Sequence, residues 1–149
     1  MALVFTLDAS VFVAACRADE PGYPASRSLL SEIRKGGIPL MEPAILPVET
    51  AAALRRAGLS AADALDYALS VTELPRLILL PIDTPLAIQS AQIAVDQSMR
   101  GVDAIYATVA DLYGAVLVTL DREQLQRGPK SVKACTPEAA RRLLSAGLP

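Results

Sequence analysis

The sequence predicts an α/β fold in which a central, mostly parallel sheet lies between two layers of helices. Short apolar runs alternate with amphipathic segments along the whole chain of 149 residues. The short runs are continuously apolar, as expected for strands of a parallel sheet that is covered on both faces. No repeat, low-complexity stretch or interdomain linker interrupts this alternation, so residues 1–149 are expected to form a single domain.

The predicted strands are short apolar runs bounded by glycine, proline or polar residues. They cover residues 3–7, 38–41, 77–80 and 115–119, with a last and shorter strand at 131–135. Ligands of open parallel sheets bind outside the carboxyl ends of the strands. That edge is therefore where a functional site is expected.

Helices are predicted between the strands from apolar residues spaced three or four apart and from their end signals. Ser60 with Asp63 resembles a capping box, and Thr84 before Pro85 is typical of a helix start. Residues 21–24 are expected to form a loop, and Gly101 is expected to separate two helices. The predicted helices begin or lie at 9–15, 26–35, 47–57, 60–74, 84–99, 103–113 and from 136 onward.

Composition limits the chemistry that the chain can perform. It has no histidine, which excludes Ser-His-Asp and Cys-His hydrolases and histidine-based zinc sites. Its two cysteines are too few for a disulfide framework or a zinc site. The net charge of −2 gives no overall basic footprint for nucleic acid, so phosphate binding must depend on local arginines. No leader or run of about 18 apolar residues is present, so a cytoplasmic protein is expected.

Four acidic residues stand at positions that the predicted fold brings to one edge. Asp8 and Asp121 each follow a predicted buried strand, so both carboxylates should reach the same side of the sheet. Asp103 begins a predicted helix directly after Gly101, and Glu49 lies in a mostly apolar first turn. Clustered carboxylates repel one another unless a cation lies between them, and Mg²⁺ and Mn²⁺ prefer such oxygen ligands. The sequence thus predicts a divalent-metal site that activates water without histidine.

The order and spacing of these acids resemble PIN-domain proteins. The start Leu-Asp-Ala-Ser-Val around Asp8 resembles the family's opening motif, and Leu-Pro-Val-Glu-Thr-Ala around Glu49 is similar to the second. The segment RGVDAIYATVADLYGAVLVTLD, which ends at Asp121 and contains Asp103, resembles the third and fourth motifs. Each motif alone is weak, but the four in order on matching elements cover nearly the whole chain.

The resemblance implies a PIN-like fold and a metal-dependent ribonuclease in the manner of VapC toxins. It implies that Asp8, Glu49, Asp103 and Asp121 hold Mg²⁺ or Mn²⁺ and carry the catalysis. By the same resemblance Ser10 and Thr119 would orient waters or carboxylates behind these ligands. A homodimer, an RNA substrate and a cognate antitoxin that occupies the site are the implied partners. The chain departs from the family in lacking a clear basic cluster.

Simpler roles for these residues, and other functions, also fit the sequence. Each acid could merely cap a helix or favour its first turn. An aspartyl-phosphate enzyme is a rival, but Asp8 lacks the acidic partner that dehalogenase-like phosphatases and receiver domains carry nearby. A non-catalytic binding or scaffold module on the same fold is the second alternative. It would leave the carboxylates without a metal.

Overall fold

A computed structural model describes residues 2–147 and shows one five-stranded sheet with eight helices in that range. The strands are β1 (Phe5–Leu7), β2 (Leu40–Pro43), β3 (Leu77–Leu80), β4 (Val116–Val118) and β5 (Ala134–Cys135). The helices are α1 (Ala9–Cys16), α2 (Tyr23–Gly36), α3 (Leu46–Arg56), α4 (Ala61–Thr72), α5 (Thr84–Gln97), α6 (Gly101–Tyr113), α7 (Arg122–Arg127) and α8 (Pro137–Ser145).

All strand pairs in the sheet are parallel, in the order β3-β2-β1-β4-β5. The chain therefore builds outward from β1 to β3, then returns to the other side of β1 to add β4 and β5. This reversal lies between β1 and β4, and such switch points are where open α/β sheets bind ligands. The predicted α/β class with a central parallel sheet is confirmed.

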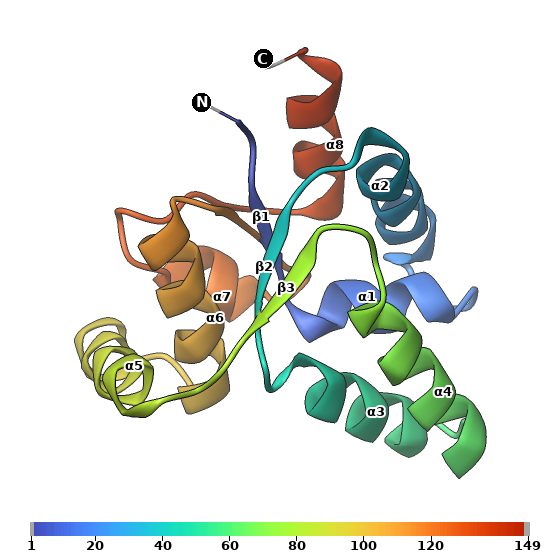
Figure 1. Ribbon diagram of the computed structural model, residues 1–149, viewed down its shortest axis with the longest axis horizontal. Coiled ribbons are helices and arrows are strands. Elements are labelled where there is room, and N and C mark those ends of the chain that lie inside the picture. Colours follow the sequence, from blue (N-terminus) through green and yellow to red (C-terminus); the bar gives the residue numbers. More distant parts are fainter. Residues whose placement is uncertain (1, 148–149) are drawn as a thin grey trace.

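The helices form two layers, one on each face of the sheet (Figure 1). Helices α5, α6 and α7 lie on one side, and α1, α2, α3, α4 and α8 lie on the other. The second layer is continuous, because α1 packs on α2 and α3, α3 on α4, and α2 on α8. Within residues 2–147, no helix has the length and apolar character needed to cross a membrane.

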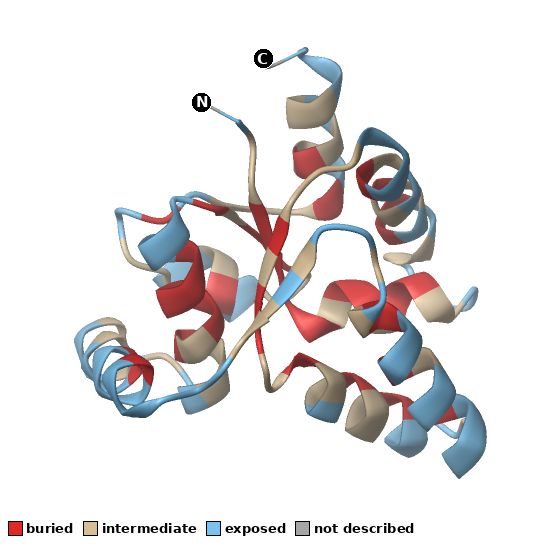
Figure 2. Ribbon diagram, in the orientation of Figure 1, coloured by how far each residue is buried: buried red, intermediate tan, exposed pale blue. Residues whose placement is uncertain are grey.

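The sheet and the inner faces of both helix layers form the buried core (Figure 2). Phe5 and Leu7 of β1 and Leu117 and Val118 of β4 have no exposed surface. Buried apolar side chains of α1, α2 and α6 pack against these strands. The two strands that precede Asp8 and Asp121 are thus the most enclosed parts of the sheet, and they fix where those carboxylates emerge.

Strand β2 lies two residues later than the predicted 38–41, because Glu42 and Pro43 belong to it. Pro43 is its last residue, where a missing N–H costs little, and the next donor, Ala44 N, bonds to Leu80 O at 2.8 Å. Glu42 is fully buried, and its Oε1 accepts a hydrogen bond from Leu7 N at 2.6 Å. A charged residue followed by proline looked like the end of a strand, but it lies inside the sheet.

Two predicted helix boundaries were wrong. Pro24 lies in the first turn of α2 and not in a loop, a position that proline tolerates because it needs no N–H donor there. Gly101 is the first residue of α6 and does not separate two helices. The break falls at Ser98, whose φ of 51° places it in the left-handed region and ends α5.

Candidate active site

Asp8 directly follows β1 and is the N-cap residue of α1. Its backbone N–H bonds to Val118 O at 2.9 Å, which ties it to β4, and its Oδ2 accepts from Ser10 N at 3.2 Å. The Thr119 hydroxyl donates to the same Oδ2 at 3.2 Å. Only 7% of Asp8 is exposed. The capping role considered from the sequence therefore coexists with a place in the site.

Asp121 lies at the same edge of the sheet, after β4, and is the N-cap residue of α7. Its Oδ1 accepts from Glu123 N at 2.8 Å and Gln124 N at 3.1 Å, whereas its Oδ2 accepts from Arg100. Asp121 N donates to Thr119 Oγ1 at 3.0 Å, so the threonine hydroxyl links Asp121 to Asp8. Ser10 Oγ accepts from Leu120 N at 3.1 Å and fixes the same turn. Ser10 and Thr119 thus hold the two strand ends together.

Asp103 and Glu49 come from the two helix layers. Asp103 lies in the first turn of α6, and Glu49 lies in the first turn of α3. Arg100, the N-cap residue of α6, forms ion pairs with both Asp103 and Asp121. Its Nε lies 3.1 Å from Asp103 Oδ2, and its Nη2 lies 2.6 Å from Asp121 Oδ2.

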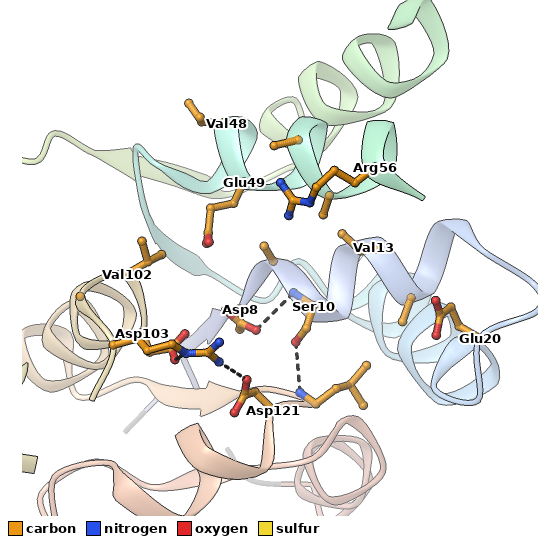
Figure 3. A pocket seen from close by; sticks show the side chains of 17 residues that line it. Asp8, Ser10, Val13, Glu20, Val48, Glu49, Arg56, Val102, Asp103 and Asp121 are labelled. Atoms are coloured by element: carbon orange, nitrogen blue, oxygen red, sulfur yellow. Dashed lines mark hydrogen bonds and ion pairs between the residues drawn. The ribbon is translucent and has the colours of Figure 1, made fainter. Parts of the chain in front are cut away.

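All four predicted carboxylates line a single pocket of about 840 Å³. Figure 3 shows Asp8, Glu49, Asp103 and Asp121 directed toward it from four different elements. The rest of its wall is mostly apolar and comes from α1 and α3. The pocket lies at the carboxyl ends of β1 and β4, which is the place that the sheet topology predicts.

Burial raises the pKa of three of these four carboxylates. It raises the pKa of Asp8, against the hydrogen bonds from Ser10 and Thr119, and repulsion from Asp121 adds to the rise. Burial likewise raises the pKa of Glu49 and of Asp103, and the charge of Asp8 adds to both. A divalent cation among these oxygens would remove the repulsion and lower these pKa values.

The oxygen-only donor set fits a hard divalent cation, and Glu49 Oε1 is buried without a hydrogen-bond partner among the described residues. Within residues 2–147, however, no three acidic or cysteine side chains stand close enough to form a ready-made ion site. The Arg100 guanidinium holds Asp103 and Asp121 toward itself. Arg100 would therefore compete with an ion for two of the four carboxylates that would hold it.

Two buried polar residues near Glu49 and Asp8, Glu42 and Tyr106, were not among the predicted site residues. Burial raises the pKa of Glu42 well above its ordinary value, and its Oε2 has no partner among the described residues. Tyr106 of α6 is buried, and its hydroxyl lowers the pKa of Glu49, although it completes no hydrogen bond within residues 2–147. An acid inside an apolar run was the available signal for Glu42, whereas Tyr106 resembles any core tyrosine.

Several solved structures resemble this chain over most of its length. The chain is 29% identical to PAE2754 from Pyrobaculum aerophilum, with a TM-score of 0.70 over 98% of this chain and 99% of that one. It is 18% identical to VapC20 of Mycobacterium tuberculosis, a sarcin-ricin loop cleaving toxin, with a TM-score of 0.68 over 87% and 98%. It is 14% identical to a chain of VapBC2 from Rickettsia felis bound to promoter DNA, with a TM-score of 0.67 over 90% and 98%.

The two lower identities show a shared fold alone, and no curated protein matches the sequence. The PIN domain, whose members are generally nucleases, matches residues 5–129. That match includes the four predicted carboxylates, Asp8, Glu49, Asp103 and Asp121, and every strand before β5. The chain therefore belongs to the PIN domain family.

Proposed function

We propose that this chain is an endoribonuclease that hydrolyses RNA phosphodiester bonds with Mg²⁺ or Mn²⁺ and acts as the toxin of a toxin–antitoxin pair. The observation that carries the proposal is the meeting of four carboxylates from separate elements in one pocket. Residues 1–149 would act as one cytoplasmic domain. Family membership and the resemblance to toxin structures support the reaction class.

Asp8, Glu49, Asp103 and Asp121 are the residues that would hold the ion. When bound, such an ion polarises a phosphoryl oxygen and lowers the pKa of a coordinated water. The protein's own part is to orient the carboxylates. Thr119 donates to Asp8 and accepts from the backbone of Asp121, so it fixes one carboxylate against the other.

Cleavage of a fluorescent single-stranded RNA tests this proposal. We expect the purified chain to cut the RNA internally in the presence of Mn²⁺ or Mg²⁺, to stop in EDTA, and to resume when the ion is restored. Calorimetric titration with Mn²⁺ should show binding. A non-catalytic module predicts neither result, so absence of both cleavage and Mn²⁺ binding would favour that alternative.

Arg100 should compete with the ion, because both require Asp103 and Asp121. We expect Arg100→Gln to bind Mn²⁺ roughly three to ten times more tightly, because the ion no longer has to displace a solvent-exposed guanidinium from these two carboxylates. Titration calorimetry, or the electron paramagnetic resonance signal of free Mn²⁺, measures this affinity. Arg127→Gln is the matched control, because Arg127 pairs with Glu123 and lies outside the pocket. Weaker Mn²⁺ binding by Arg100→Gln would contradict the prediction.

We further propose a homodimer and a cognate antitoxin. Several exposed apolar side chains on three successive elements support a protein interface, since exposed apolar side chains commonly mark such contacts. They are Leu65 and Leu69 of α4, Ile78 of the edge strand β3, and Ile88 and Val95 of α5. Light scattering after gel filtration should give twice the chain mass of 15.7 kDa. A monomer at micromolar concentration would rule the homodimer out.

A further inference from the structure

The pocket that holds the carboxylates continues along α3, and this part carries an arginine. Arg56 lines the pocket, and its guanidinium makes no hydrogen bond or ion pair with any residue in 2–147. Figure 3 shows its side chain reaching from α3 into the pocket, with the guanidinium turned toward Glu49. A cation so placed, without a protein partner, is available to an anionic ligand.

Helix geometry places Arg56 on the same face of α3 as Glu49. The two residues are seven positions apart, which is about two turns or roughly 10 Å along the helix axis. Ala52 and Ala53 line the pocket between them, and Val13 lines it on the side of α1. An apolar part of the pocket therefore connects its acidic end to Arg56.

The other arginine of the pocket, and the acid Glu20 at its edge, already have partners. Arg100 is bound by Asp103 and Asp121, and Glu20 pairs with Arg17 at 2.6 Å. Arg56 is therefore the uncommitted cation among the pocket's described lining residues. In a chain of net charge −2, this local cation is where attraction for a polyanion concentrates.

We propose that Arg56 binds a backbone phosphate of the RNA adjacent to the phosphate that is cleaved. This inference rests on the proposed ribonuclease function and adds a substrate subsite to it. The guanidinium offers paired N–H donors that match phosphate oxygens. The apolar part of the pocket accommodates the nucleoside between the two phosphates, because ribose and base present large weakly polar surfaces. Arg56 thereby positions the RNA so that the phosphate to be cleaved lies at the acidic end of the pocket.

Neighbouring Arg55 provides a matched control. It lies on the same helix, but its Nη1 donates to Leu59 O at 3.1 Å and it does not line the pocket. We expect Arg56→Gln to lower kcat/KM for a tetranucleotide RNA about tenfold or more, mainly through KM, since hydrogen bonds to charged groups are strong. Arg55→Gln should change it less than twofold. Thermal unfolding of both variants checks that the fold is retained.

Substrate length separates phosphate binding from a structural role of Arg56. A dinucleotide has only the scissile phosphodiester, so Arg56 has no second phosphate to bind. The ratio of kcat/KM between wild type and Arg56→Gln should therefore be at least about fivefold larger on the tetranucleotide than on the dinucleotide. Equal deficits on both substrates, or the same deficit in Arg55→Gln, would overturn the assignment. If wild type cleaves no RNA, the proposed function fails as well. If wild type cleaves and Arg56→Gln behaves like Arg55→Gln, only the subsite fails.

Discussion

Asp8→Asn is expected to reduce RNA cleavage by about a thousandfold or more while leaving the protein folded. The replacement removes a negative charge from the most buried carboxylate of the pocket. Loss of about 4 kcal/mol of charge stabilisation in the transition state corresponds to a thousandfold lower rate. The asparagine carbonyl can still accept hydrogen bonds from Ser10 N and Thr119 Oγ1, so the cap of α1 is kept.

Single-turnover cleavage with saturating Mn²⁺ measures this loss without interference from product release. Asp66→Asn is the control, because Asp66 is an exposed carboxylate of α4 outside the pocket. It should retain full activity. Asp103→Asn and Asp121→Asn should resemble Asp8→Asn, since all three are proposed ligands of one ion. If Asp8→Asn cleaves RNA as fast as wild type, the metal-dependent mechanism is wrong.

The sequence predicted the placement of the carboxylates because that placement depends on local pattern and chain topology. Asp8 and Asp121 follow apolar runs that form neighbouring strands, and parallel strands deliver their following residues to one edge. Asp103 was placed by the start of its helix, whose observed first residue lies two positions earlier. The general α/β alternation required no knowledge of side-chain contacts, and the described structure agrees with it.

Features that depend on tertiary contacts could not be predicted in this way. Glu42 lies inside the sheet because its carboxyl accepts a hydrogen bond from a strand 35 residues away in sequence. Arg100 bridges Asp103 and Asp121 only because α6 and the end of β4 meet in space. The pocket position of Arg56, and its contrast with Arg55, follows from how α3 packs over α1. The seven-residue spacing from Glu49 places Arg56, and not Arg55, on the face of α3 that carries Glu49, but only the packed structure shows that this face lines a pocket.

The second large effect expected is an opposite response of the metal-free and metal-bound protein to pH. The pKa values of Asp8, Glu49 and Asp103 are raised in the folded chain, chiefly by burial. The folded state therefore retains protons that the unfolded state releases above about pH 4. The resulting stability is fully present at low pH and is lost as pH rises through the raised pKa values. Metal-free protein should unfold at a lower temperature at pH 8 than at pH 5.5.

Mn²⁺ should reverse this trend, because its binding requires the same carboxylates to be deprotonated. An ion at about a hundred times its Kd adds about 2.7 kcal/mol, which is a shift of roughly 5–10 °C for a domain of this size. We expect that shift at pH 8 and a much smaller one at pH 5.5, measured by calorimetry or circular dichroism. Equal shifts at both pH values would mean that the ion binds elsewhere than these carboxylates.

Glu42 allows the two contributions to pH dependence to be separated. Its pKa is also raised by burial, so it gives the metal-free protein a loss of stability at high pH with the same sign. It is not among the carboxylates proposed to hold the ion. Glu42→Gln should therefore weaken the pH dependence of metal-free unfolding but keep the Mn²⁺ shift at pH 8. Asp8→Asn should weaken both, because Asp8, unlike Glu42, has a raised pKa and is also a proposed ligand of the ion.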